Sequence, residues 1–338
     1  MGKQNRKFFT HNSVVFVTSS VREGLPLIPT SLFNFILIGI LAKANSLYGG
    51  VRICHFVFMA NHFHMLLVVK KQEDAPAFIG YVKQEISHTI NRFLNRSGVS
   101  IWSDGYDSPL LLTFDKVIHY IIYMYLNSTK ANLENSIEEF PGLSSWKMFL
   151  TSQYSKICKH IRRSDVPCIL GSSLGDGALD ITEQKRLLEA LQELSNEDIE
   201  LVIEPFAWVE CFAELHNANI HEIKASIIKQ IRDSEQQQRA ERKTNKISLI
   251  GATRLKCQSI LQKFQSKRKG KRMICIGSHK EHRIAFIKYF REICAKADVI
   301  YKQWKEFDLN AQMPPGLFAP HLPLQICALP ICFSHILT

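Results

Sequence analysis

Two histidines, His62 and His64, are separated by one hydrophobic residue in the run Asn-His-Phe-His-Met at residues 61–65. They lie inside a largely apolar stretch at residues 54–69, which is typical of a buried strand. Because successive side chains of a strand point to opposite faces, both imidazoles would lie on one face. Adjacent imidazoles can bind a metal ion, so we interpret the pair as half of a metal site. A hydrogen-bonded core or edge residue is the commoner explanation for a single histidine, but not for this pair.

A second set of polar side chains lies on a predicted helix at residues 113–127. This segment contains neither Gly nor Pro, and its apolar residues recur at helical intervals. Tyr123 and Asn127 are four residues apart and therefore share a face, with His119 one turn earlier, whereas Tyr125 points elsewhere. A phenol beside an amide suits a nucleophile next to a third metal ligand. Without the histidines, the same segment would be an aromatic-rich amphipathic helix with no chemistry of its own.

Five blocks of sequence resemble, in the same order, those of the REP-associated tyrosine transposases, which are single-tyrosine HUH transposases related to small insertion sequences. The blocks are residues 14–26, 56–67, 101–106, 123–132 and 140–146. The second block carries the histidine pair and the fourth carries the tyrosine. The resemblance covers residues 8–150. Ala60 and Ser128 depart from it, because they stand where the family has prolines that shape turns but perform no chemistry.

The resemblance implies roles for four residues. His62 and His64 match the metal-binding pair, and Asn127 matches the residue that completes the metal shell. Tyr123 matches the catalytic tyrosine, whose phenolate would attack a phosphodiester to give a 5′-phosphotyrosine and a free 3′-hydroxyl. Mg²⁺ or Mn²⁺ is the expected cofactor, because two imidazoles and one amide form a neutral site that leaves positions open for phosphate oxygens.

The ordinary pKa of tyrosine, about 10, requires that the nucleophile be activated. Four residues stay open as helpers: Lys83, Gln84, His88 and His119.

Composition agrees with a nucleic-acid partner. The chain has 338 residues, a formal net charge of +11 and a pI of about 9.2. Residues 224–272 contain fifteen Lys and Arg residues against three acidic ones, a net charge of +12. A charge run is more often an exposed helix face or a linker, but beside the proposed nicking residues it favours DNA binding. The predicted DNA contacts are Lys83, Arg92, Arg242, Lys243, Lys246, Arg254, Lys267, Arg268, Lys269, Lys271 and Arg272.

The pattern predicts an α+β fold. Residues 8–150 are expected to form an antiparallel sheet with helices packed on one face, which is also the ferredoxin-like HUH nuclease arrangement that the resemblance implies. Strands are predicted at residues 13–20, 51–58, 62–69 and 110–113, and helices at 31–45, 77–95 and 113–127.

A mostly α-helical C-terminal region is expected to follow. Residues 151–180, rich in Ser, Gly and Asp toward their end, are expected to be a linker. Residues 181–320 would form a basic helical domain, with helices at 182–194, from 197, at 221–242, around Gly251 and from 278 to 307. Ser278 and Glu281 have the spacing of a capping box. The abruptly apolar residues 321–338 are expected to be a doubtful tail from a truncated or chimeric reading frame, and they receive no function.

Other compartments and partners are disfavoured. No apolar run is long enough to span a membrane, and the start of the chain does not resemble a signal peptide. Nine scattered cysteines without a C-x-x-C pair argue against a disulfide framework or zinc ribbon. We therefore expect a bacterial, cytoplasmic, nucleoid-associated protein. A monomer and a homodimer, with the tyrosine acting within or across subunits, both stay open.

Three functions remain as alternatives. The favoured one is a metal-dependent transposase that cleaves and rejoins single-stranded DNA near hairpins, whose stem and unpaired bases would both be recognised. A domesticated relative that binds hairpin DNA without cutting is the second. An unrelated metal phosphohydrolase acting on a small substrate is the third, and it would need neither Tyr123 nor the basic segment.

Overall fold

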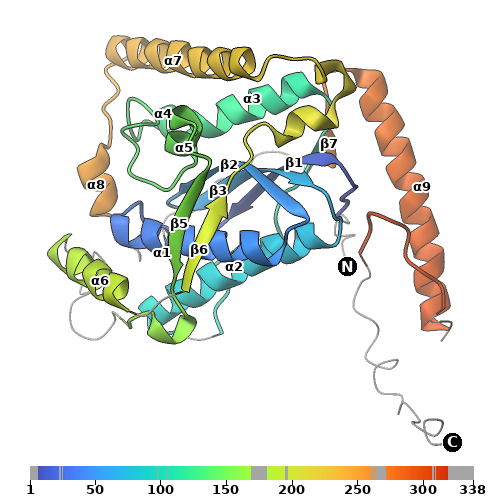
Figure 1. Cartoon of the computed structure of the whole chain (residues 1–338), viewed down its shortest axis with the longest axis horizontal. Helices are drawn as coiled ribbons and strands as arrows, with labels where there is room; N and C mark the ends of the chain where they lie inside the picture. Colours follow the sequence, from blue (N-terminus) through green and yellow to red (C-terminus); the bar gives the residue numbers. More distant parts are fainter. Residues whose placement is uncertain are drawn as a thin grey trace, which may run out of the picture.

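The computed structural model describes residues 7–22, 24, 26–96, 98–103, 105–168, 181–194, 197–259, 262, 272–306, 308 and 310–318. Its centre is a sheet with strand order β2-β3-β1-β4-β7 (Figure 1). The strands are β1 (Ser13–Ser20), β2 (Val51–Met59), β3 (His62–Val69), β4 (Leu110–Leu111) and β7 (Cys275–Ile276). Strands β2 and β3 form an antiparallel hairpin, β1 pairs antiparallel with β3 and β4, and β7 adds in parallel to β4.

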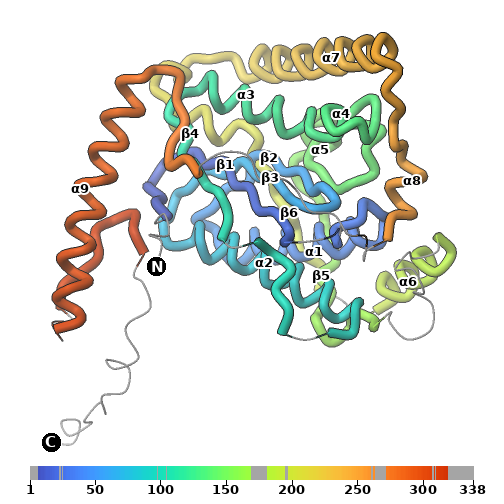
Figure 2. The backbone as a smooth tube through the Cα atoms, turned by 180° about the vertical axis from the view of Figure 1, so that it is seen from behind, coloured from blue at the N-terminus to red at the C-terminus, as the bar shows by residue number. Residues whose placement is uncertain are grey.

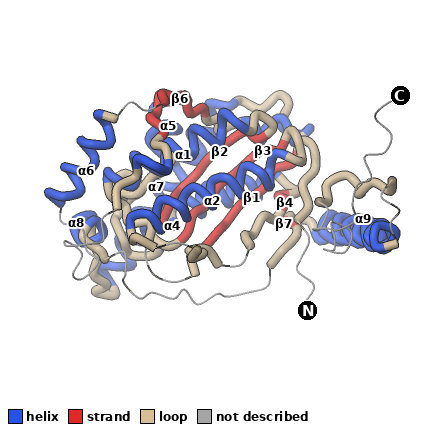
Figure 3. Tube along the Cα trace, turned by 90° about the horizontal axis from the view of Figure 1, so that it is seen from below, coloured by secondary structure: helices blue, strands red, loops and turns tan. Residues whose placement is uncertain are grey.

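Two helices connect the first four strands in a ferredoxin-like order. Helix α1 (Ser31–Leu47) joins β1 to β2, and α2 (Asp74–Phe93) joins β3 to β4. Both lie across the same face of the sheet, as the view in Figure 3 shows. Phe63 and Met65 of β3 lie in the core on this side, where apolar residues of both helices surround them. The predicted α+β fold with an antiparallel-dominated sheet is thereby confirmed.

Helices also cover the opposite face, which differs from the expected one-sided arrangement. There α3 (Phe114–Tyr125) packs its buried residues Val117 and Ile121 in one cluster with Leu66 and Val68 of β3. The physical reason is that β3 is apolar on both faces, so each face requires cover. The other helices on this side are α4 (Asn127–Lys130), α5 (Trp146–Thr151) and α7 (Ile220–Thr244), and Figures 1 and 2 show α7 running alongside α3.

The segment expected to be a linker contains a strand in its described part. Strand β5 (Ser155–His160) pairs antiparallel with β6 (Glu197–Val202), and the two lie against α1. The helix predicted from residue 197 is therefore wrong, because Ile199 and Leu201 alternate with exposed residues as a half-buried strand requires. Gly39 permits the contact, since a Cβ there would lie 2.2 Å from the Lys159 carbonyl oxygen.

The rest of the C-terminal region is largely helical. It contains α6 (Ile181–Glu193), α8 (Ala252–Lys256), α9 (Lys280–Lys305) and short 3₁₀ turns at Ala207–Cys211 and Ala213–Leu215, and another turn, Arg163–Asp165, precedes it. The predicted capping box is not formed, because His279 is the N-cap of α9 and the Ser278 hydroxyl donates to Asp115 instead. Within the described ranges, no helix is both long and apolar enough to cross a membrane.

The Pro-Pro-Gly-Leu-Phe run at residues 314–318 packs against residues near the start of the chain. The Phe9 amide donates to the Gly316 carbonyl at 3.1 Å, and Phe8 forms a bridge with Leu317. Gly316 has a φ of 88°, and a Cβ there would meet the Phe8 ring. Residues 321–338, the expected tail, lie outside the described residues, as do residues 169–180 of the expected linker.

Candidate active site

Strand β3 places His62 and His64 on the face of the sheet that α3 covers, with their ring centroids 4.8 Å apart. The side-chain nitrogen Nδ2 of Asn127 lies 3.2 Å from Nε2 of His62 and 2.7 Å from Nε2 of His64. Asn127 is the first residue of α4, two residues after the end of α3 at Tyr125. The structure thus brings together the three residues that the sequence nominated as metal ligands.

The other ring nitrogen of each histidine has its own partner. Nδ1 of His62 lies 2.7 Å from Oδ1 of Asn61, and Nδ1 of His64 lies 2.9 Å from Oγ1 of Thr18. The Asn61 amide oxygen can only accept, so His62 carries its proton on Nδ1, and Thr18 can accept from His64 in the same way. Both Nε2 lone pairs then point toward Asn127. Such outer partners are what fixes the tautomer of metal-binding histidines.

Burial keeps both imidazoles neutral. It lowers the pKa of His62 to about 4. The pKa of His64 is lowered well below its ordinary value by burial, together with the adjacent His62. Neutral imidazole is the form that binds a metal ion.

The donor set fits a divalent cation. The Nδ2 group of Asn127 donates to the two imidazole lone pairs, and half a turn of the amide would bring Oδ1 to the same place. Two nitrogens and one oxygen would then face a common point, with the remaining coordination positions open. Among the described residues, no group of three or more His, Cys, Asp or Glu side chains comes together.

Tyr123 lies beside this cluster and is accessible. Its side chain is 36% exposed, and its ring centroid lies 5.7 Å from that of His64. Phe16 of β1 touches both rings, at 5.2 Å from His64 in a stacked arrangement and at 6.3 Å from Tyr123. Lys130, seven residues after Tyr123, holds its Nζ 5.4 Å from the centre of the Tyr123 ring. An accessible phenol and a cation thus lie next to His62, His64 and Asn127.

Tyr125 has a different environment, as the helical spacing predicted. It is fully buried, and its hydroxyl lies 2.7 Å from Nδ1 of His55 and 2.8 Å from Oγ of Ser145. Burial raises its pKa far above the ordinary value. Tyr125 is therefore a core residue, whereas the side chain of Tyr123 is accessible beside this cluster.

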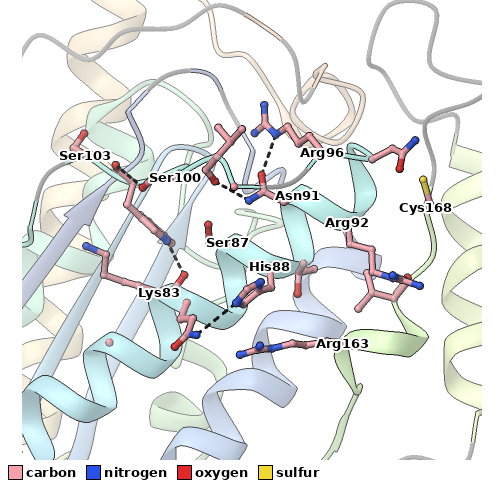
Figure 4. Close-up of a pocket in the computed structure, with 18 of the residues that line it drawn as sticks. Lys83, Ser87, His88, Asn91, Arg92, Arg96, Ser100, Ser103, Arg163 and Cys168 are labelled. Atoms are coloured by element: carbon pink, nitrogen blue, oxygen red, sulfur yellow. Dashed lines mark hydrogen bonds between the residues drawn. The ribbon is translucent and has the colours of Figure 1, made fainter. Parts of the chain in front are cut away.

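Lys83 and Arg92 line a groove of about 1090 Å³ beside α2, shown in Figure 4. Lys83 Nζ donates to the Gly105 carbonyl at 2.7 Å, and Arg92 Nη2 donates to the Ser164 carbonyl at 2.9 Å. Since α2 covers the sheet face opposite α3, neither residue reaches the Tyr123 cluster.

The same placement applies to the open choice of tyrosine helpers. Gln84 and His88 line the α2 groove with Lys83, as Figure 4 shows for His88. His119 instead lines a hollow together with Tyr123. Of the four candidate helper residues, His119 is the one on the same side of the sheet as Tyr123.

The remaining basic residues divide into four groups. Arg242 is buried and donates to the Thr129 carbonyl and to Oδ1 of Asn135, both at 3.1 Å, so it ties α7 to α4 rather than facing DNA. Arg272 is paired with Asp107 at 3.1 Å. Lys243, Lys246 and Arg254 are exposed, whereas Lys267, Arg268, Lys269 and Lys271 lie outside the described residues.

Four residues of the site were missed from the sequence: Thr18, Asn61, Phe16 and Lys130. Thr18 lies directly opposite His64 in the β1–β3 register, a pairing that only strand alignment reveals. Asn61 precedes His62, so its proximity was available in the motif. Lys130 lies seven residues after Tyr123, a spacing that returns to the same face of a continuous helix.

No family model and no curated protein matches the chain. Among solved structures, it is similar to a REP-associated tyrosine transposase bound to a REP hairpin, with 14% identity, a TM-score of 0.39 and coverage of 53% of this chain and 100% of that one. It is also similar to a transposase candidate from Deinococcus radiodurans R1, with 16% identity, a TM-score of 0.24 and coverage of 36% and 97%. These low values leave the roles of individual residues to the geometry of this chain.

Proposed function

We propose that this protein is a transposase that cleaves and rejoins single-stranded DNA near hairpins, with Tyr123 as the nucleophile. The observation that carries the proposal is the convergence of two unprotonated imidazole nitrogens and one amide beside an accessible phenol. The resemblance of five sequence blocks to the REP-associated tyrosine transposases supports the same reading.

In this proposal His62, His64 and Asn127 hold Mg²⁺ or Mn²⁺, which when bound would neutralise charge on the phosphate oxygens. The Tyr123 oxygen forms a bond to phosphorus while the bond to the 3′-oxygen breaks. The phenol loses its proton to solvent or to His119, and the departing 3′-oxygen gains one. Because the 5′-phosphotyrosine keeps a high-energy linkage, attack by another 3′-hydroxyl reverses the step and transfers the strand.

Lys130 would contribute only through its positive charge. Its ammonium lies over the Tyr123 ring, where it would attract an incoming phosphate. Exposed Lys243, Lys246 and Arg254 supply cations for the DNA backbone. A homodimer and a location in the bacterial cytoplasm stay predictions of the sequence.

The test is a nicking assay on single-stranded hairpin DNA taken from the flanks of the gene, with Mg²⁺ or Mn²⁺, read on denaturing gels. We expect a covalent protein–DNA band that requires the metal and disappears in Tyr123→Phe and in His62→Ala/His64→Ala. Tight hairpin binding without a band in the wild type would replace the proposal with the non-cleaving binder. A band that persists in Tyr123→Phe would reject Tyr123 as the nucleophile.

A further inference from the structure

Helix α9 has two long faces with different environments. On one face Phe290, Ile293 and Ala297 are buried against the rest of the protein. On the opposite face, Ile284 and Val299 are 55% and 56% exposed. Figures 1 and 3 show α9 at one end of the molecule, beyond the sheet and the other helices, so its outer face is open to a partner.

The outer face is a continuous stripe, because residues three and four apart share one side of a helix. This outer stripe consists of Glu281, Ile284, Lys288, Arg291, Glu292, Ala295, Val299 and Lys302, all of them exposed. At 1.5 Å per residue it is about 30 Å long. No ion pair joins Arg291 or Glu292 to another described residue, so these two charges at the middle of the stripe are available to a partner.

The middle of the outer stripe is complementary to itself. In an antiparallel pair of α9 helices with the two-fold axis midway between residues 291 and 292, Arg291 would face Glu292 of a second copy. The symmetry repeats this contact, since the second copy presents its Arg291 to Glu292 of the first. The centre of such a pair would therefore contain two contacts between opposite charges.

The ends of the outer stripe match in the same register. There Ile284 would face Val299 of the second copy, so that the two large exposed apolar residues cover each other. One turn farther out, Glu281 would face Lys302, again with opposite charges. The remaining position would place Lys288 opposite the small side chain of Ala295.

Other arrangements of the outer stripe bring like charges together. Parallel helices in register would place Arg291 opposite Arg291 and Lys302 opposite Lys302. A shift of the antiparallel pair by seven residues would place Lys288 opposite either itself or Lys302. Because like charges that face each other are unfavourable, the stripe favours one orientation and one register.

We propose that the outer stripe of α9 is a self-association surface, on which a second copy of this chain binds antiparallel through the same residues. Because the stripe contains only two large apolar residues, the dimer is weak and reversible rather than obligate. The inference goes beyond the proposed function and does not depend on whether Tyr123 cleaves DNA.

Sedimentation velocity of the full chain without DNA, over a range of protein concentrations, measures the association. Arg291→Glu should weaken it more than about tenfold, since like charges then face each other twice at the two-fold axis, and Glu292→Arg should do the same. Arg291→Glu/Glu292→Arg exchanges the two charges and should restore the dimer. Lys229→Glu, at an exposed position of α7, makes the same change in net charge as Arg291→Glu and should leave the association unchanged.

A mixture of the two single variants gives the sharpest test. The Arg291→Glu chain presents two carboxylates at the axis, and the Glu292→Arg chain presents two guanidinium groups. Every central contact between them joins opposite charges, so the mixed pair should associate more than about tenfold more tightly than either variant with itself. Labelling one variant with a fluorophore distinguishes the mixed pair.

The inference is overturned if the wild type stays monomeric up to about 100 µM, where a dimer with a dissociation constant of that size would be partly formed. A wild-type dimer that Arg291→Glu and Glu292→Arg leave intact would place the association on another surface, which also overturns it. So would a mixture that associates no better than its components. Thermal unfolding of each variant is compared with the wild type, so that a folding defect is not read as lost association.

Discussion

His64 is held at both ring nitrogens, by Thr18 at Nδ1 and by Asn127 at Nε2. The first contact sets which nitrogen carries the proton, and the second marks where a cation would sit. Replacing an outer partner of a metal-binding histidine typically weakens metal affinity about 10–100-fold. Thr18 is therefore as much a part of the candidate site as His64, whose ring it contacts.

We predict that Thr18→Val weakens Mn²⁺ binding about 10–100-fold, since valine has a similar shape but cannot accept from His64 Nδ1–H. Isothermal titration of the purified protein with Mn²⁺ measures this. Thr18→Ser keeps the oxygen and should stay close to the wild type. Equal affinities for the valine and serine variants would show that Thr18 does not orient His64.

Two of the three tyrosines of α3, Tyr123 and Tyr125, should respond in opposite ways to loss of their hydroxyls. Tyr125→Phe leaves His55 Nδ1 buried without its partner, so we predict a loss of about 1–3 kcal/mol in the free energy of unfolding. Tyr123→Phe removes an accessible hydroxyl and should change that energy by less than about 0.5 kcal/mol, while abolishing adduct formation. Urea denaturation measures both, and a larger loss for Tyr123→Phe would contradict these assignments.

At the scale of elements, α7 is tied to the α3–α4 segment that contains Tyr123 and Asn127. Arg242 is the buried link between the end of α7 and the α4 turn that holds Asn127. We predict that Arg242→Ala costs about 2 kcal/mol or more in the free energy of unfolding, because it leaves buried carbonyl and amide acceptors unpaired. Lys243→Ala, at the adjacent exposed position, should change it by less than about 0.5 kcal/mol.

Denaturation curves of the two variants test whether Arg242 ties α7 to α4. Hydrogen exchange at residues 127–135 shows where in the chain that stabilisation acts. Exchange there should quicken in Arg242→Ala only. If both variants unfold alike, Arg242 is a surface cation, as the sequence alone had suggested.

The contact between α1 and β5 offers a matched pair of glycines. Gly39→Ala would place a Cβ 2.2 Å from the Lys159 carbonyl oxygen, so we predict a loss of about 1–3 kcal/mol. Gly80→Ala, in the interior of α2 with no atom within 4 Å of its Cβ, should instead stabilise by about 0.5–1 kcal/mol. Thermal or urea unfolding of both distinguishes them. A neutral Gly39→Ala would mean that β5 lies farther from α1.

Periodicity predicted the early elements and the later helices α6, α7 and α9 well, but it missed the later strands β5, β6 and β7, for physical reasons. Strand β3 and helix α3 have long apolar patterns, and their observed bounds lie within a few residues of those expected. Strand β6 is short and acidic, so its partner β5 rather than its own composition determines its conformation. Strand β7 has two residues and exists only because β4 offers an edge.

The candidate site was predictable in its ligands but not in its surroundings. Local geometry is enough to place His62 and His64 on one face of a strand. It is also enough to place Tyr123 and Asn127 on one face of a helix. Their meeting, and the role of Thr18, depends on strand register and on the face that α3 covers. Arg242 could not be told from its exposed neighbour Lys243, because burial depends on packing against α4.

At the scale of the whole molecule, the exposed cations Lys243 and Lys246 lie at the end of α7, beside Asn245 and Ile247 of the hollow that Tyr123 lines, and Arg254 follows in α8, whereas α9 forms the other side of the molecule (Figure 2). We predict that Lys243→Gln/Lys246→Gln/Arg254→Gln weakens hairpin binding and lowers the slope of log affinity against log salt by about 2. The control variant Lys288→Gln/Lys296→Gln/Lys302→Gln removes the same charge from exposed positions of α9. Fluorescence anisotropy at several salt concentrations measures both.

A comparable loss of hairpin affinity in both triple variants would mean that net charge alone, rather than the position of Lys243, Lys246 and Arg254, governs DNA binding.

The most direct test of the central claim is to locate the covalent bond. The protein is incubated with single-stranded hairpin DNA and Mn²⁺, digested with nuclease and trypsin, and analysed by tandem mass spectrometry. The tryptic peptide at residues 117–130 contains Tyr120, Tyr123 and Tyr125, so fragment ions can assign the modified side chain. We predict a 5′-phosphonucleotide on Tyr123. A nucleotide on another residue, or an unmodified peptide from DNA that the protein demonstrably binds, would contradict the proposed function.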